Sequence, residues 1–178
     1  MIRKYLSFLF FFIIPTFAQD AFRTDMDVAY KVQPSGVTTV VNTITLQNLF
    51  TDLYATSYTL VLDNIKPVNF TVSEGKKNLP FEIKTESSKT SIVVSFPDSL
   101  VGRGNKRLFN VTYDDPTIAQ RTGEVWEITI PRLSSDSSFS SYHLSFMVPN
   151  AFGEAAYISP NPERKEVKDG YKIYSFDK

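Results

Sequence analysis

The chain contains no cysteine, a single histidine and a single tryptophan among its 178 residues. Without cysteine the chain has no disulfide, no zinc–thiolate site and no cysteine nucleophile, and it cannot be a lipoprotein, whose lipid is attached to a cysteine. Small extracellular domains of eukaryotes often carry disulfides, so their absence favours a bacterial envelope protein. The 19 basic and 19 acidic residues balance. A net charge of zero gives no electrostatic reason to expect nucleic acid or an anionic membrane as a partner.

The first 18 residues have the three-part pattern of a secretory signal peptide. Arg3 and Lys4 supply a positive start, an apolar run extends from Tyr5 to Ile14, and small residues end the segment at Ala18. The apolar run is shorter than the roughly 20 residues that a membrane-spanning helix requires. We therefore expect cleavage after Ala18 and a secreted or extracytoplasmic protein, with a retained anchor as the alternative.

Beyond Ala18, apolar and polar residues alternate along most segments, and no window of ten or more residues has the apolar spacing of an amphipathic helix. Two alternating runs, 26–32 and 40–46, flank a turn at Pro34-Ser35-Gly36 and predict a hairpin. The pattern predicts an all-β fold, an antiparallel immunoglobulin-like β-sandwich, with a closed barrel as the alternative. Further strands are expected at 54–62, 68–72, 81–83, 92–96, 109–113, 126–130 and 142–148.

The composition of the last residues of the chain differs from that of the preceding strands. A proline-containing segment at 160–162 and the charged residues 163–166 have the composition of a linker, and an alternating strand begins at Tyr171. We expect a signal peptide at 1–18, one β-sandwich domain at 19–160, and at 161–178 a linker with the first strand of a second, truncated domain. A return of this strand to the first sheet is the alternative.

The chain offers little for catalysis. A hydrolase or transferase needs a nucleophile, a base and an orienting group, and His143 is the only histidine. It is expected on the solvent face of a strand, between Tyr142 and Leu144. The serine-rich segment 134–141 predicts a flexible loop, and no G-x-S-x-G motif is present. We predict no catalytic residue and no enzyme activity in this chain.

Three polar segments were weighed as binding sites. Asp25 with Asp27, and Asp114 with Asp115, are carboxylate pairs, but no D-x-D-x-D-G calcium loop is present, so a solvated strand face and a turn are expected. The glycine-rich basic segment 102–107 lacks the G-K-[ST] ending of a phosphate loop and predicts a hairpin loop. No metal and no cofactor is expected.

Aromatic residues give the one candidate ligand surface. Trp126 and Tyr113 could together form a platform on which a sugar stacks, as in an adhesion or glycan-binding module. However, Trp126 alternates in step with Ile128 and Ile130, so the core is the simpler location for its ring.

Several short runs carry a resemblance to a known family: 43–49, 54–60, 116–120, 125–133 and 157–162. In this order they resemble the amino-terminal β-sandwich region of secreted transglutaminase-like proteins of uncultured bacteria, over about residues 28–162. The resemblance implies one or more sandwich domains, a papain-like domain with Cys, His and Asp, and often a membrane anchor further on. None of these catalytic residues can be assigned here, because the chain has no cysteine.

Together these features predict a non-catalytic extracytoplasmic module, an accessory or spacer region of a transglutaminase-like envelope protein. Its expected partners are downstream domains of the same polypeptide and a cell-surface protein or glycan, but not nucleic acid, with the membrane reached only through an anchor outside this chain. The alternative is an independent adhesion or glycan-binding module. An unpaired strand at 171–176 would be available to recruit a partner strand.

Overall fold

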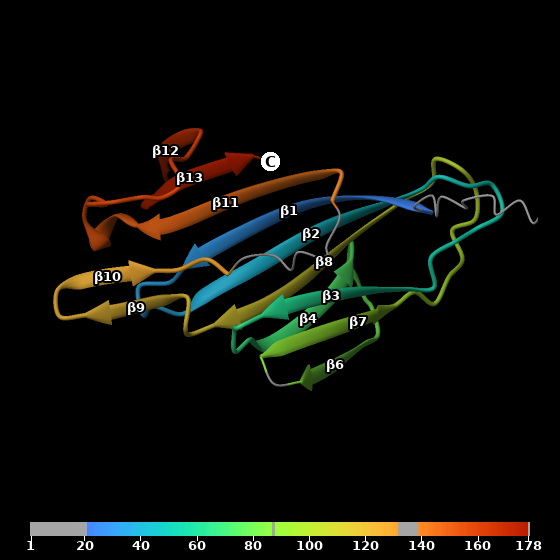
Figure 1. The fold of residues 1–178 in the computed structure, drawn as a ribbon, viewed down its shortest axis with the longest axis horizontal. Coiled ribbons are helices and arrows are strands. Elements are labelled where there is room, and N and C mark those ends of the chain that lie inside the picture. Colours follow the sequence, from blue (N-terminus) through green and yellow to red (C-terminus); the bar gives the residue numbers. More distant parts are fainter. Residues whose placement is uncertain (1–20, 87, 132–138, 178) are drawn as a thin grey trace, which may run out of the picture.

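A computed structural model describes residues 21–86, 88–131 and 139–177, which form an all-β fold (Figure 1). The predicted signal peptide, 1–18, and serines 134, 135, 137 and 138 lie outside the described residues. Eight strands form one sheet in the order β12-β13-β11-β1-β2-β8-β4-β5, and two smaller sheets have the orders β3-β7-β6 and β10-β9. The strands are β1 Phe22–Val32, β2 Thr38–Asn48, β3 Ser57–Asp63, β4 Val68–Glu74, β5 Lys77–Asn78, β6 Phe81–Glu86, β7 Lys89–Ser95, β8 Lys106–Asp115, β9 Ala119–Thr122, β10 Val125–Ile128, β11 Ser141–Pro149, β12 Arg164–Lys168 and β13 Tyr171–Asp177.

The predicted all-β sandwich with antiparallel sheets is confirmed. The described residues contain one short 3-10 turn, Asn150–Phe152, and none of them forms a helix with the length and hydrophobicity needed to cross a membrane. The strands are distributed differently from those of an immunoglobulin constant domain, whose two sheets have four and three strands. Here a broad sheet of eight strands is paired with a narrow sheet of three.

The predicted hairpin of β1 and β2 is present at the centre of the eight-stranded sheet. The two strands pair antiparallel along their whole length, with Tyr30 opposite Val40. Their inward residues are buried and their outward residues are partly exposed, as the alternation predicted. The turn between them contains Gly36 at φ +92°, a conformation that a residue with a Cβ rarely adopts.

One neighbour of β1 departs from the antiparallel pattern. β11 pairs with β1 in parallel, so that Asp27 lies beside His143 and Tyr30 beside Phe146. These segments are far apart in the sequence, and a connection through β2 to β10 separates them. The sheet is therefore mixed at this one pair and antiparallel at its other pairs.

The carboxyl-terminal segment differs from the sequence-based expectation. Residues 171–177, expected to begin a second domain, form β13, which pairs antiparallel with β11 and lies between β11 and β12 (Figure 1). Tyr174 is buried in the core, and Phe176 packs against the core. Burial of these aromatic rings is the physical reason that β13 joins the main sheet. Because β13 is paired on both sides, it offers no open edge to a partner strand.

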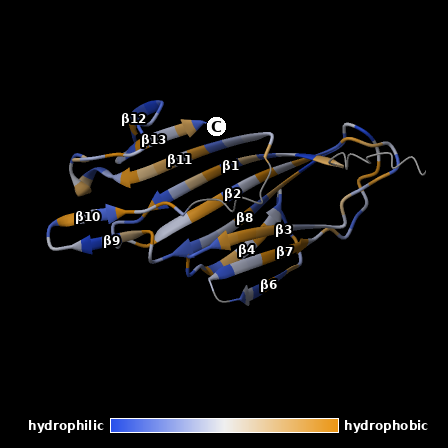
Figure 2. Ribbon diagram, viewed as in Figure 1, coloured by the Kyte–Doolittle hydropathy of each residue, from blue (hydrophilic) through white to orange (hydrophobic). Residues whose placement is uncertain are grey.

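The narrow sheet covers part of one face of the broad sheet and encloses the main core. Phe109 of β8 contacts Tyr58 of β3, with ring centroids 5.4 Å apart, and Phe96, which follows β7, at 5.2 Å. Both contacts are close to perpendicular, the geometry that aromatic rings favour. Figure 2 shows apolar and polar residues mixed along β1, β2 and β11. Buried residues alternate with more exposed ones along these strands, so one face of the broad sheet is directed to the core and the other outward.

Candidate functional site

The uncovered face of the broad sheet carries short polar side chains in register. One row crosses the sheet from β13 to β4, because each residue pairs with the next across neighbouring strands. It is formed by Asp177, His143, Asp27, Thr43, Asn110 and Ser73. The hydroxyl of Thr43 donates to Asn110 at 2.9 Å, so neighbouring side chains satisfy one another along this row.

His143 lies on this open face, as the sequence predicted. Its neighbour Leu144 is buried, and its own Nδ1 contacts the carboxylate of Asp177. Asp27 of β1 lies on the other side of it in the sheet. The imidazole is thus flanked by two carboxylates, yet no group of three metal-ligating side chains is found in the described ranges 21–86, 88–131 and 139–177.

In the first acidic pair, Asp25 is engaged by two neighbouring side chains. Asp25 accepts a hydrogen bond of 2.9 Å from the hydroxyl of Ser141, and Arg23 donates to it at 3.1 Å. The Ser141 contact joins β11 to β1, the two strands that pair in parallel. Asp25 therefore reinforces the sheet.

The second acidic pair, expected in a solvated turn, is at the end of β8. Asp115 is fully buried and accepts hydrogen bonds from the amide and hydroxyl of Thr117, at 2.7 and 2.6 Å, and from the amide of Lys66. Asp114 points to the opposite face and accepts from Thr39 and Asn69. The expectation of a solvated turn was wrong for Asp115, because its carboxylate satisfies otherwise unpaired donors in the loops that meet there.

Tyr113 and Trp126 do not form a joint aromatic platform. Tyr113 is 1% exposed and lies in the main core, where burial raises the pKa of its hydroxyl. Its ring is therefore closed to a ligand, in contrast to the sugar-stacking hypothesis. The alternation of Phe109, Val111 and Tyr113 along β8 already indicated this location.

Trp126 is partly buried at one end of the molecule, on β10. Its indole stacks on the ring of Phe152 with 4.1 Å between centroids and 4° between planes. The six-membered ring also lies against Gly36, where an added Cβ would come within 2.8 Å of Cζ3. One face of the indole is thus occupied by Phe152, and the residue packs against the core, as its alternation with Ile128 predicted.

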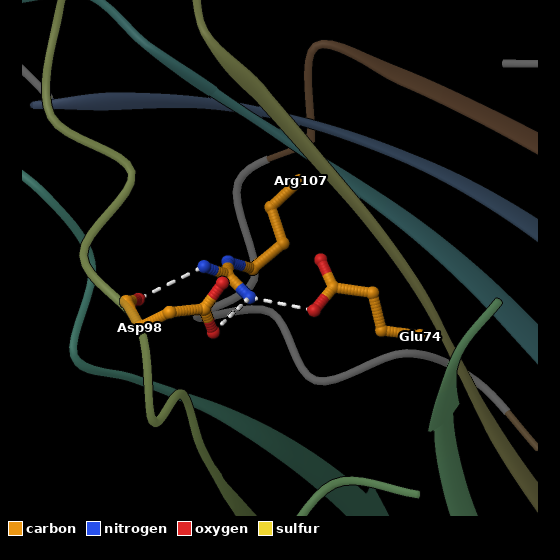
Figure 3. Close-up of polar contacts among 3 residues, drawn as sticks. All are labelled: Glu74, Asp98 and Arg107. Carbon is orange, nitrogen blue, oxygen red and sulfur yellow. Dashed lines mark hydrogen bonds and ion pairs between the residues drawn. The ribbon is translucent and has the colours of Figure 1, made fainter. Parts of the chain in front are cut away.

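A buried arginine, Arg107, joins two strands of the broad sheet to the segment that follows β7, a contact that the sequence pattern had not suggested (Figure 3). Arg107 of β8 is 4% exposed, and its guanidinium contacts Glu74 of β4 at 2.7 Å and Asp98, after β7, at 3.4 Å. It also donates to the carbonyl oxygen of Asp98 at 3.0 Å and lies 4.5 Å from the ring of Phe96. The hydrogen bond from Arg107 is the main reason that the pKa of Asp98 falls below its usual value.

Arg107 was expected in a hairpin loop with Gly102 and Gly104, but it is the second residue of β8. Arg107, Phe109 and Val111 occupy every second position of β8. The side chain of Arg107 therefore points to the same buried face as those of Phe109 and Val111. A buried guanidinium needs carboxylate or carbonyl acceptors, and Glu74 and Asp98 supply them. The cluster is therefore suited to holding the two sheets together.

Comparison with known proteins shows similarity in fold. Neither a family model nor a curated protein sequence matches the chain. Among solved structures, a putative protease from Parabacteroides distasonis matches with a TM-score of 0.52 and 14% identity, over 90% of this chain and 35% of that one. Yeast LTA4 hydrolase in complex with bestatin matches with a TM-score of 0.52 and 12% identity, over 87% and 26%.

A third match is an M1 zinc metallopeptidase from Deinococcus radiodurans bound to a Tyr-Ser-Ala substrate. Its TM-score is 0.50 and its identity 11%, over 89% of this chain and 38% of that one. The chain thus spans about a third of the length of these proteins. At identities of 11–14% this likeness concerns the fold alone.

Proposed function

We propose that this chain is a non-catalytic β domain that supports the catalytic domain of a larger, exported protein. The observation that carries the proposal is the coverage of the three structural matches. Each match includes 87–90% of this chain but only 26–38% of the solved protein. Those proteins are named as a peptidase, a putative protease and a hydrolase, and most of their length lies outside the part that resembles this chain.

The chemistry of the described side chains supports this role. The groups that could act as bases or ligands, His143, Asp25 and Asp115, are engaged with neighbours that connect strands or loops. Arg107 is enclosed by acceptors from its own chain. Each of these contacts contributes to the rigidity of the sheets, which is what a supporting domain requires.

Two kinds of catalytic domain fit the proposal. The sequence resemblance implies a transglutaminase-like domain with Cys, His and Asp, whereas the fold likeness suggests a zinc peptidase, whose sequence mark is H-E-x-x-H on a helix. The reading frame of the gene after the codon for Lys178 tests both. Cys, His and Asp in transglutaminase order would support the first, H-E-x-x-H would support the second, and a frame with neither would overturn the proposal.

Export is the second part of the proposal and rests on the signal pattern of Met1 to Ala18. Expression of the whole gene with its native start, followed by amino-terminal sequencing of the extracytoplasmic protein, tests it. A mature terminus at Gln19 is expected. Recovery of the protein in the cytoplasm with Met1 in place would contradict export.

The adhesion or glycan-binding alternative gains no support from the two residues first considered for it. Tyr113 is enclosed in the core, and Phe152 covers one face of Trp126. Because Trp126 is the only tryptophan, its fluorescence can be followed during titration with oligosaccharides. A saturable change in emission would revive the alternative.

A further inference from the structure

The narrow sheet ends at a strand whose outer edge is open. β6 is the last strand in the order β3-β7-β6 and pairs with β7 on one side (Figure 1). In the part of the chain that the structure describes, no strand lies on its other side. An open edge presents a row of backbone N–H and C=O groups that can pair with another chain.

The side chains of β6 fall into two sets. Phe81, Ile83 and Thr85 lie opposite Val94, Ile92 and Thr90 of β7, all of which are buried, so these three side chains share the inner face of the sheet. Ile83 is nevertheless 44% exposed, because nothing beyond β6 covers it. The other set, Glu82, Lys84 and Glu86, is exposed on the outer face and alternates in charge.

We propose that β6 is an interaction edge for a second copy of this chain, joined by antiparallel pairing of β6 with β6 about a two-fold axis at Ile83. In this register Ile83 lies beside its own counterpart, which covers both exposed side chains. Glu82 lies opposite Lys84 of the second copy, and Lys84 lies opposite Glu82. Opposite charges that face each other across an antiparallel pair stabilise it. The inference goes beyond the proposed function and does not depend on it.

Two other edge strands of comparable length fit a second copy less well. β3 is the opposite edge of the narrow sheet, and Asp63, its one charged residue, would have no oppositely charged residue to face in a symmetric pair. β12, with the sequence Arg-Lys-Glu-Val-Lys, is the edge strand of the broad sheet. A two-fold axis at its central residue, Glu166, would place Arg164 opposite Lys168, and like charges in facing positions destabilise a strand pair. Lysine on an edge strand is a common protection against pairing. In symmetric pairing about the central residue, the charge pattern thus favours β6 over β12 and β3.

The experiment is a charge swap, read by sedimentation equilibrium of the purified chain over a range of concentrations. The unchanged protein is expected to approach twice the monomer mass as concentration rises. Lys84→Glu places Glu82 opposite a glutamate in both symmetric pairs, and should weaken dimerisation about tenfold or more. The double variant Glu82→Lys/Lys84→Glu re-forms both pairs with the charges exchanged, and should restore the affinity.

A matched control carries the same charge change at the other edge. Lys165→Glu lies on β12 and should leave dimerisation unchanged. Hydrogen exchange gives an independent readout, because the alternate amides of β6 that face away from β7 should become protected as the dimer forms. A protein that stays monomeric overturns the proposal. A dimer that Lys84→Glu leaves intact also overturns it. The proposal is overturned as well if the double variant does not restore the dimer although its circular dichroism shows an unchanged fold.

Discussion

The guanidinium of Arg107 and the carboxylate of Glu74 are 2.7 Å apart, and the arginine side chain is almost completely buried. The pair joins β8 to β4, and the additional bonds from Arg107 to Asp98 extend the link to the segment that follows β7. One side chain therefore connects β8 and β4 of the broad sheet to the segment that leaves the narrow sheet after β7.

Arg107→Ala should lower the free energy of unfolding by about 2 kcal/mol, because Glu74 is left partly buried without its partner. Urea denaturation measures the change. Arg103→Ala, in the exposed loop just before β8, removes the same charge and should stay within about 0.5 kcal/mol of the unchanged protein. Equal effects of the two variants would show that the ion pair does not stabilise the fold.

Gly36→Ala should destabilise the protein by about 2 kcal/mol or more. The residue has φ +92°, and an added Cβ would come within 2.8 Å of the Trp126 ring. Gly153→Ala is the matched control, since Gly153 has φ +83° but open space around it. A larger loss at Gly36, with a shift in tryptophan emission, is expected. Identical losses would mean that contact with Trp126 adds nothing.

Tyr174→Ala tests whether β13 belongs to the first domain. The ring is buried in the core, and its loss should cost about 3 kcal/mol. Tyr157→Ala, at a highly exposed position, should change stability by less than about 0.5 kcal/mol. A single cooperative transition at lower urea concentration is the expected result for Tyr174→Ala. An unaltered transition would favour an independent carboxyl-terminal segment.

Alkaline pH should destabilise the protein through Tyr58. Burial raises the pKa of its hydroxyl to about 12, whereas its unfolded value is about 10. The stability contributed by the neutral hydroxyl is complete below about pH 10 and is lost as pH rises towards 12, because the unfolded chain ionises first. Tyr58→Phe should therefore show a shallower fall in the free energy of unfolding over this interval.

The control for Tyr58 is Tyr54→Phe, which removes a hydroxyl from an exposed ring just before β3. Its stability should fall with pH as steeply as that of the unchanged protein. If Tyr58→Phe also falls as steeply, ionisation of this buried hydroxyl does not contribute to alkaline unfolding.

Much of the fold followed from alternation along single strands. The hairpin of β1 and β2 was predictable because its apolar residues recur every second position around a turn with proline and glycine. The same rule, applied two residues further back along β8, would have placed Arg107 inside with Phe109. It was missed because glycines 102 and 104 made the segment resemble a loop.

Other features depend on partners far away in the sequence. The parallel pairing of β1 with β11 cannot be predicted from the sequence of either strand. The alternation of apolar and polar residues shows which side chains face the core, but it does not specify the neighbouring strand or its direction. The proline-containing, charged segment before β13 has the composition of a linker, yet Tyr174 returns to the core. The composition of residues 160–166 reflects only their local exposure to solvent. The position of β13 depends on the burial of its aromatic rings against the core.

The parallel pair also sets an order for folding. The hydrogen bond between Ser141 and Asp25 spans 116 residues of sequence, and closing so long a loop slows the formation of contacts. Until β11 arrives, β1 presents an open edge along the middle of the future sheet. During synthesis this edge is open to wrong pairing, and only the last quarter of the sequence, which contains β11, closes it.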